Sequence, residues 1–401
     1  MQALKHNLFQ VGFGFGLSTL IGACSSSSSP LALPTDPEPG PPTVTVLASN
    51  LDSPRGITLG PDQQLYVAEA GRGPAGGFDP NQPTAPSPSV PGAQLQSGTT
   101  GAITRIDPET GEVQRVLTNL PSVAIPAGEP VLQPPTGADS LGPTDVAFAP
   151  DGQLYFLIGL GTDPANREIL NTPELGSLVT ADPVASDPNS TVRYLADVAA
   201  VEAQTNPDGT DVVSNPYSLL VQEDSVWIID AGANVLLQSD RNGNDLAVNT
   251  VFGEIRFFPN PGIPGAPDPL PMQQVPTAIT LGPDGQFYVS ELTGLPFPLG
   301  EARILSLETS EPTTAFSGFT NLVDIDFDSQ GNLWILEYDS DSILGEAPFG
   351  SLIRLEPNGV RTTILADLIT PTAVTVGPDG EVYVANQGFN AGEGEILKLE
   401  F

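Results

Sequence analysis

The chain has 401 residues, with 48 acidic side chains against 13 basic ones and a formal net charge of -35. A surface this acidic has no basic area to displace the counterions of nucleic-acid phosphates, which excludes nucleic acid as a partner. Gly and Pro contribute 42 and 43 residues and favour many short strands joined by turns over a helical protein.

The beginning of the chain, residues 1–23, resembles an export signal. A short basic segment precedes an apolar run, residues 11–20, that is too short to span a bilayer as a stable helix. Two small residues and then Cys24 follow, which is the pattern of a bacterial lipobox. We expect cleavage before Cys24 and lipidation of this residue, giving a membrane-anchored lipoprotein that faces the periplasm from the inner or outer membrane. An ordinary signal peptide cut nearby is the alternative.

His6 and Cys24 are the only histidine and cysteine in the sequence. Removal of residues 1–23 and lipidation of Cys24 would leave no imidazole and no free thiol. That excludes Ser-His-Asp and Cys-His catalysis, histidine-ligated zinc and disulfides. Chemistry would then depend on carboxylates, Tyr, Arg, hydroxyl groups, a hard cation or a cofactor, which favours a binding protein over an enzyme.

A repeat follows residues 24–43, a stretch rich in Ser and Pro that is predicted to be a flexible tether. The repeated unit is a Pro or Asn, an apolar strand, a turn with an Asp, and a second apolar strand. Its six turn residues are Asp62, Asp151, Asp224, Asp284, Asp328 and Asp379. The shortest interval between them, 44 residues, is the period of a four-stranded blade. We therefore predict an all-β protein, a six-bladed β-propeller over residues 44–401.

The two ends of this region are complementary. The last blade ends at Phe401 after three strands, and residues 44–48 form a strand with no partner before the first repeat. Pairing of the strand at 44–48 with the last blade would close the ring and remove two exposed sheet edges. Two three-bladed domains or a β-sandwich are the alternatives, although no linker-like stretch separates the repeats.

The long connections all belong to one face of the predicted propeller. They join second to third strands, or one blade to the next, at residues 70–101, 159–176, 183–214, 259–275, 292–300 and 338–350. The turns of the opposite face stay short. Because functional loops elaborate on a rigid scaffold, we expect a ligand or partner to bind the loop-rich face. Within these loops, residues 191–206 show helical spacing and are predicted to form a short lid or plug helix.

Polar side chains end the second strands of five blades, where the long loops begin: Glu69, Asp230, Glu291, Glu337 and Asn386. Oxygen ligands that converge near a channel entrance suit a hard cation such as Ca²⁺, and Asp145, Asn215 and Asp324 could add ligands. The same residues are typical of strand-end caps that accept hydrogen bonds from loop amides, and acid–base chemistry is a third interpretation. Capping is the simplest of the three.

Three arginines, Arg55, Arg72 and Arg193, lie at or near the same face. They could hold an anionic ligand. With so many carboxylates nearby, surface ion pairs are the simpler interpretation.

Several short motifs carry a resemblance, at residues 51–56, 66–73, 100–105, 206–209, 214–218, 230–234, 275–277, 291–298 and 318–321. Together they resemble the ScyD/ScyE family of exported cyanobacterial propellers, which are relatives of the NHL-repeat group. The resemblance implies a link to the biosynthesis of scytonemin, an indolic-phenolic sunscreen pigment whose later steps are placed in the periplasm. It implies no catalytic residues.

Three functions follow from these observations. The first is a lipid-anchored propeller that binds a small molecule or a periplasmic protein on its loop-rich face. The second, by analogy with six-bladed propeller enzymes, is a Ca²⁺-dependent hydrolase or lactonase that would need Glu69, Asp230, Glu291 and Glu337 to converge on one ion. The third is a pathway enzyme that uses Glu or Tyr as acid and base.

Overall fold

The computed structural model describes residues 41–401, apart from residues 89, 91, 132–136 and 346–348. The predicted export signal with Cys24 and nearly all of the predicted tether lie outside the described residues. In the described part, no helix is long and apolar enough to cross a bilayer.

Six sheets follow one another along the chain as blades, each beginning with its innermost strand. Blade 1 contains β2 (Pro54–Leu59), β3 (Leu65–Glu69), β5 (Gln94–Ile106) and β6 (Val113–Ile125), with β4 (Ala85–Pro86) and β7 (Ala138–Leu141) added to it. Blade 2 contains β8 (Pro143–Phe148), β9 (Leu154–Ile158), β10 (Ser177–Ala181) and β11 (Arg193–Asp197). Blade 3 contains β12 (Pro216–Val221), β13 (Ser225–Asp230), β14 (Val235–Asp240) and β15 (Ala247–Val251).

The second half of the ring repeats this order. Blade 4 contains β18 (Pro276–Leu281), β19 (Phe287–Glu291), β20 (Ala302–Leu307) and β21 (Thr313–Phe319). Blade 5 contains β22 (Leu322–Phe327), β23 (Leu333–Glu337), β24 (Phe349–Leu355) and β25 (Arg361–Ile369). Blade 6 contains β26 (Ala373–Val376), β27 (Val382–Asn386), β28 (Ala391–Glu400) and β1 (Thr43–Asp52).

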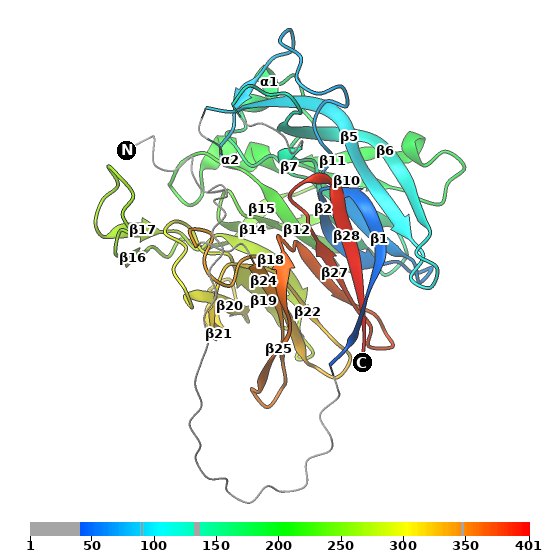
Figure 1. The fold of residues 1–401 in the computed structure, drawn as a ribbon, viewed down its shortest axis with the longest axis vertical. Helices are drawn as coiled ribbons and strands as arrows, with labels where there is room; N and C mark the ends of the chain where they lie inside the picture. The colour runs from blue at the N-terminus through cyan, green and yellow to red at the C-terminus, as the bar shows by residue number, and fades with distance from the viewer. Residues whose placement is uncertain (1–40, 89, 91, 132–136, 346–348) are drawn as a thin grey trace, which may run out of the picture.

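The ring is closed. Each innermost strand packs beside the next, and β26 packs beside β2. The first strand, β1, pairs antiparallel with β28, so that Val44 lies opposite Leu399 and Val46 opposite Leu397. Figure 1 shows these two strands, blue and red, side by side. The predicted six-bladed propeller and its closure by the strand at 44–48 are confirmed, and the closing strand extends further, to Asp52.

The turn aspartates hold the hairpins of the repeat. Asp62 accepts a hydrogen bond from the Gln64 amide (3.3 Å) and one from the Tyr66 hydroxyl (3.1 Å). The Tyr66 ring is buried and contacts Phe148 of blade 2 edge-on, with ring centroids 4.8 Å apart. In blade 1 the same side chain therefore joins the hairpin to its own turn and to the next blade.

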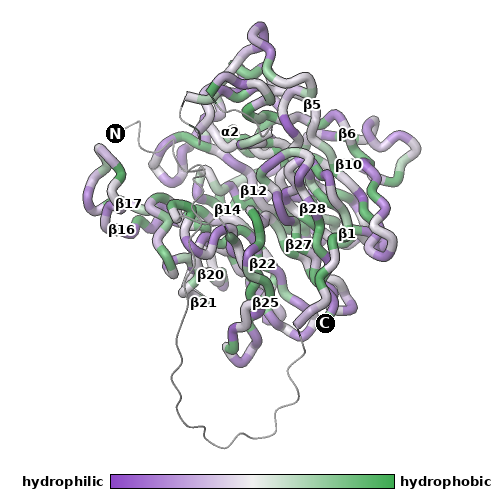
Figure 2. The backbone as a smooth tube through the Cα atoms, viewed as in Figure 1, coloured by the Kyte–Doolittle hydropathy of each residue, from purple (hydrophilic) through white to green (hydrophobic). Residues whose placement is uncertain are grey.

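The apolar core lies between the blades. Ile229 and Leu236 of blade 3, for example, form one buried cluster with Ile279 and Val289 of blade 4. Figure 2 shows apolar segments in body strands such as β27, with polar segments at the projecting loops. Because the blade faces are used for packing, the polar groups available for function lie along the axis and in the loops.

The connections between blades differ in part from expectation. The helix predicted over residues 191–206 is wrong in its first half, because Arg193–Asp197 form β11, the outer strand of blade 2. The side chains of β11 are exposed or half-buried, so they lack the apolar alternation that marks a strand. The helix α2 covers Ala199–Thr205 alone. The other short elements of the described loops are α1 (Asn166–Ile169), the 3-10 turn η1 (Pro188–Thr191) and the hairpin of β16 (Arg256–Phe258) with β17 (Leu270–Met272).

Candidate functional site

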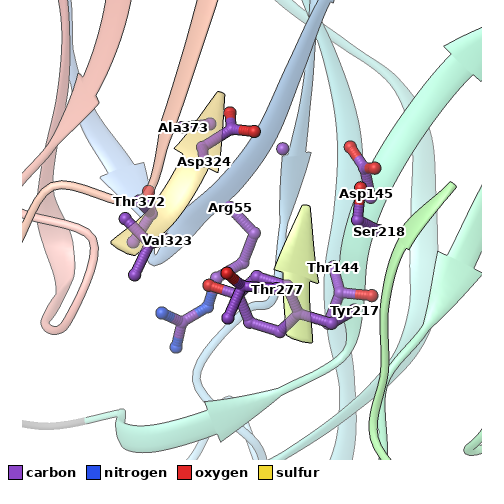
Figure 3. Close-up of a pocket in the computed structure, with 11 residues that line it drawn as sticks. Arg55, Thr144, Asp145, Tyr217, Ser218, Thr277, Val323, Asp324, Thr372 and Ala373 are labelled. Atoms are coloured by element: carbon purple, nitrogen blue, oxygen red, sulfur yellow. The ribbon is translucent and has the colours of Figure 1, made fainter. Parts of the chain in front are cut away.

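The innermost segments of all six blades meet at a small cavity on the axis. One lining residue from each blade directly follows the Pro or Leu that opens the innermost segment: Arg55, Thr144, Tyr217, Thr277, Val323 and Thr372. Innermost strands begin where the loops between blades arrive. The cavity therefore lies at the loop-rich end of the channel, and Figure 3 shows its lining side chains.

Three lining threonines have structural roles. The hydroxyl groups of Thr144, Thr277 and Thr372 each donate to a main-chain carbonyl of the next blade, at 2.9, 3.0 and 2.9 Å. These bonds join blade 2 to 3, blade 4 to 5 and blade 6 to 1. Each hydroxyl donates its single proton in this bond, so the three threonines hold neighbouring blades together and have no proton left to donate to a ligand.

Two aspartates face each other across the cavity. Asp145 and Asp324 occupy the next position in blades 2 and 5, which are three blades apart in a ring of six (Figure 3). Asp145 accepts hydrogen bonds from the Val146 amide and, across the blade boundary, from the Leu219 amide, both at 2.8 Å. Asp324 accepts the equivalent pair of bonds, from the Ile325 amide at 2.9 Å and, across the boundary to blade 6, from the Val374 amide at 2.7 Å. Each carboxyl group therefore joins two blades and also lines the cavity.

Enclosure by the ring changes the acidity of these groups. Burial raises the pKa of Asp145 to about 7, and the main-chain bonds to its carboxylate reduce the effect. Burial also raises the pKa of Asp324 well above its usual value, and repulsion from Asp145 adds to this. Asp326, two residues further along β22, has its pKa raised by burial to about 6. At neutral pH the two carboxyl groups that line the cavity, Asp145 and Asp324, are therefore protonated for part of the time.

The folded protein should be more stable near pH 5 than near pH 8. A carboxyl group whose pKa is higher in the folded than in the unfolded state binds its proton more tightly when folded. Its stabilising contribution is complete below the unfolded pKa of about 4 and is lost as the pH rises through the folded values, about 6 for Asp326 and about 7 for Asp145. The melting temperature of the full chain measured from pH 4 to 8 tests this.

The matched controls for the pH series separate burial from overall charge. Asp145→Asn should flatten the fall in melting temperature, whereas Asp379→Asn, at an exposed turn, should leave it unchanged. Identical slopes for Asp145→Asn and the parent chain would show that general charge repulsion, not the axial aspartates, sets the pH dependence.

The other ionisable groups that line the cavity are the guanidinium of Arg55 and the phenol of Tyr217, and the phenol of Tyr338 lies nearby. Arg55 donates to the Ser140 carbonyl at 3.0 Å and forms no ion pair with the described residues. Tyr217 lines the cavity, and Tyr338 lies close enough for Arg55 to act on its pKa. Within the described chain neither phenol hydroxyl takes part in a hydrogen bond. Burial raises both phenol pKa values to about 12, so both hydroxyls keep their protons at neutral pH.

The residues that end the second strands are mostly structural caps. The side chains of Glu69, Asp230, Glu337 and Asn386 accept hydrogen bonds from the amides of Asp52, Asn215, Thr320 and Ile369, at 2.6, 2.6, 2.8 and 2.8 Å. Each of those amides lies just before the innermost strand of the same blade. The bond therefore fixes the incoming loop to the strand end, which is the capping interpretation of the sequence. Burial raises the pKa of Asp230 and of Glu337.

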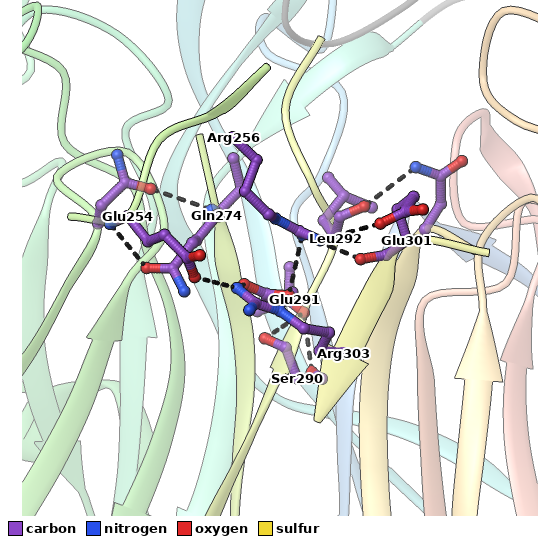
Figure 4. A network of polar contacts seen from close by, with 12 residues as sticks. Glu254, Arg256, Gln274, Ser290, Glu291, Leu292, Glu301 and Arg303 are labelled. Carbon is purple, nitrogen blue, oxygen red and sulfur yellow. Dashed lines mark hydrogen bonds and ion pairs between the residues drawn. The ribbon is translucent and has the colours of Figure 1, made fainter. Parts of the chain in front are cut away.

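Glu291 is bound by two arginines, whereas Glu69 combines its loop amide with one, Arg115, whose Nε and Nη2 donate to the Glu69 carboxylate at 2.9 and 2.7 Å. Glu291 is fully buried, and its two carboxylate oxygens accept from Nη2 and Nε of Arg303 at 2.7 and 2.8 Å. Nη2 of Arg256 lies 3.4 Å away, and Glu254 and Glu301 bind the outer sides of the two arginines (Figure 4). This network neutralises the buried carboxylate and joins the loop after blade 3 to blade 4.

The structure does not bring the predicted calcium ligands together. Glu69, Asp230, Glu291 and Glu337 lie in four blades, each with its own partners. Across the described residues, no three acidic, histidine or cysteine side chains are grouped to hold a metal ion. Asn215 lies between blades 2 and 3, where its side-chain oxygen accepts from the Leu160 amide at 3.4 Å. The axial cavity gathers only Asp145 and Asp324 from the residues proposed as ligands.

Sequence reasoning missed part of this site. Arg55 was assigned to surface ion pairs, which is what Arg72 forms, with Asp52. Tyr217 and Tyr338 were not singled out. A usable signal was present, because alignment of the six repeats on their opening Pro or Leu places Arg55 and Tyr217 at the same position as the three threonines that hold neighbouring blades together.

No protein-family model and no curated protein matches the chain. Solved structures with a similar fold include the PQQ-bound aldose sugar dehydrogenase from Streptomyces coelicolor, at 13% identity and a TM-score of 0.49, covering 90% of this chain and 99% of that one. A gluconolactonase from Xanthomonas campestris is 10% identical with a TM-score of 0.49, and the match covers 90% of this chain and 89% of that one. Virginiamycin B lyase from Staphylococcus aureus is 14% identical with a TM-score of 0.45, and the match covers 90% of this chain and 99% of that one. Identities and TM-scores this low support no shared activity.

Proposed function

We propose that the protein is an exported β-propeller that binds a small aromatic carboxylate in its axial cavity. The observation that carries the proposal is that Arg55 and Tyr217 meet there with donors that the fold leaves unused. A guanidinium can form two parallel hydrogen bonds with one carboxylate. The phenol ring of Tyr217 supplies a flat apolar face against which an aromatic ligand packs.

The dimensions of the cavity limit the ligand. The enclosed space of the cavity is about 20 Å³, enough for about one water molecule and far below the roughly 300–1,000 Å³ of pockets for drug-sized ligands. A carboxylate group suits this scale, and a single indole or phenol ring attached to it would lie at the open mouth of the cavity. Because protonation of Asp145 and Asp324 removes negative charge from the cavity, affinity for a carboxylate should weaken as the pH rises from 6 to 8.

The proposal also includes a cellular location and a biosynthetic pathway for the protein. The lipobox-like run before Cys24 and the Ser- and Pro-rich segment after it support a lipid-anchored protein facing the periplasm. The resemblance to the ScyD/ScyE family supports a role in the biosynthesis of scytonemin. Indolic and phenolic molecules are the ligand class which that role implies.

Titration calorimetry of the full chain at pH 6, with indole-3-carboxylate and 4-hydroxybenzoate as probes, tests the proposal. Arg55→Met should weaken binding at least about tenfold, because a charge-assisted hydrogen bond contributes about 1.5–3 kcal/mol. Tyr217→Phe should weaken it about fivefold through loss of one neutral hydrogen bond. Neither change removes a bond that holds blades together, so both variants should melt close to the parent chain.

The control for the titration is Arg193→Met, which removes an exposed arginine of blade 2 away from the cavity. It should bind both probes as the parent chain does. Absence of binding by either probe, or equal affinities for the parent chain and Arg55→Met, would contradict the proposal.

A further inference from the structure

The segment that joins blade 2 to blade 3 buries a carboxylate without a partner. Glu202, on α2, is 1% exposed, and neither of its oxygens accepts a well-formed hydrogen bond. The Val213 amide is near enough to lower the pKa of Glu202 but is not in bonding geometry. Burial of an unpaired carboxylate is strongly unfavourable, so this group needs a proton or a cation.

A second buried acceptor lies one helical turn away. Asn206 ends α2 in the left-handed conformation, with φ of 39°, and its amide nitrogen donates to the Thr210 carbonyl at 2.8 Å. That bond fixes the orientation of the side-chain amide. Its oxygen is buried and accepts no hydrogen bond within the described chain. Glu202 and Asn206 therefore present three oxygen atoms that lack donors, and the main-chain amide of Asn206 donates to the Glu202 carbonyl at 2.9 Å, which holds the two residues together at the end of α2.

The surroundings add negative charge. Asp208 and Asp230 lie close enough to raise the pKa of Glu202, to which burial contributes most. None of the ion pairs formed by the described residues includes these three carboxylates. Asp208 is itself satisfied, because it accepts from the Thr210 amide (2.8 Å) and from Asn234 (2.8 Å). The loop is thus held in place by its own bonds, and its field favours a cation beside Glu202.

We propose that Glu202 and Asn206 bind one Ca²⁺ ion at the join of blades 2 and 3, apart from the axial cavity. A carboxylate and an amide oxygen are ligands that Ca²⁺ prefers, and main-chain carbonyls and water commonly complete its six to eight positions. The site differs from a cluster of acidic ligands, because a single carboxylate contacts the ion directly. So few charged ligands predict the weak affinity typical of extracellular modules, with Kd of about 10⁻⁴–10⁻³ M.

The test is the melting temperature of the full chain at pH 7.5 in CaCl₂ up to about ten times this Kd, with KCl added to keep ionic strength constant. Constant ionic strength removes the general effect of salt on a chain with a net charge of -35. The melting temperature of the parent chain should rise with Ca²⁺ and saturate. In Glu202→Gln the apparent affinity should fall at least about tenfold. Without added ion, this variant should melt no lower than the parent, since an amide is easier to bury than a charge.

Asp339→Asn is the matched control, because Asp339 is also a buried acid, with a pKa raised to about 6 by burial, but lies elsewhere. It should keep the full response to Ca²⁺. Two results would overturn the proposal. The first is no response of the parent chain to Ca²⁺, which would mean that Glu202 is held as the neutral acid. The second is a response that persists in Glu202→Gln, which would place the ion at another site.

Discussion

Arg303→Met should lower the free energy of unfolding by about 3 kcal/mol. Glu291 is fully buried, and Arg303 supplies both of its short ion-pair contacts. Removal of one partner from a buried pair leaves an uncompensated charge in a medium that solvates it poorly, which costs about 3–5 kcal/mol. We place the effect at the lower end because Arg256 remains 3.4 Å from the carboxylate. Equilibrium urea denaturation measures the change.

Two variants show whether the charge is responsible. Arg354→Met removes an arginine whose side chain is 16% exposed, close to the 14% of Arg303. The carboxylate that it pairs with, Glu356, is 30% exposed, whereas Glu291 is fully buried. Arg354→Met should cost less than about 1 kcal/mol. The double variant Arg303→Met with Glu291→Gln removes both charges and should recover at least half of the loss. A single-variant loss as small as that of Arg354→Met would show that Arg256 alone neutralises Glu291.

Gly56→Ala should destabilise the protein by about 2–3 kcal/mol, at the upper end for overpacking. A methyl group on Gly56 would lie 2.0 Å from a carboxylate oxygen of Asp145 and 2.7 Å from the Asp145 main chain. The side chain of Asp145 is held by two amides and cannot move away without losing the bond to blade 3. Blades 1 and 2 must therefore separate at the axis. Urea denaturation again gives the magnitude.

Gly76→Ala is the matched control for this steric effect, because a methyl group there would meet nothing within 4 Å. Its stability should stay within about 0.5 kcal/mol of the parent. Gly56→Ala should also weaken binding of indole-3-carboxylate, since Gly56 and Asp145 both line the cavity. If Gly56→Ala were as stable as Gly76→Ala, the close contact between the first two blades would be refuted.

The repeat explains why the fold was predictable. Each copy places an apolar pair of strands around a turn aspartate, and the pairing of Asp62 with Tyr66 is encoded within five residues. The closing strand β1 followed from counting strands at the two ends. By contrast β11 was missed, because an outer strand whose side chains are exposed, such as Arg193 and Tyr194, needs no apolar alternation.

The site was less predictable because it depends on which residues the ring brings together. The sequence led to the second-strand carboxylates, and the structure shows that Glu69 and Glu337 accept hydrogen bonds from amides that lie just before the innermost strands of their blades. Asp145 and Asp324 were recognised as candidates, but their position across the axis follows from blade number and not from local pattern. The lack of a partner for Glu202 is a property of packing alone.

The most direct measurement is a crystal structure of the full chain soaked with 4-bromobenzoate, in which anomalous scattering locates the bromine atom. The carboxylate should lie on the Arg55 guanidinium, within hydrogen-bond distance of the Tyr217 hydroxyl, with the ring at the mouth of the cavity. Bromine found only among the outer loops, or an empty channel at a concentration that saturates binding in solution, would contradict an axial ligand site.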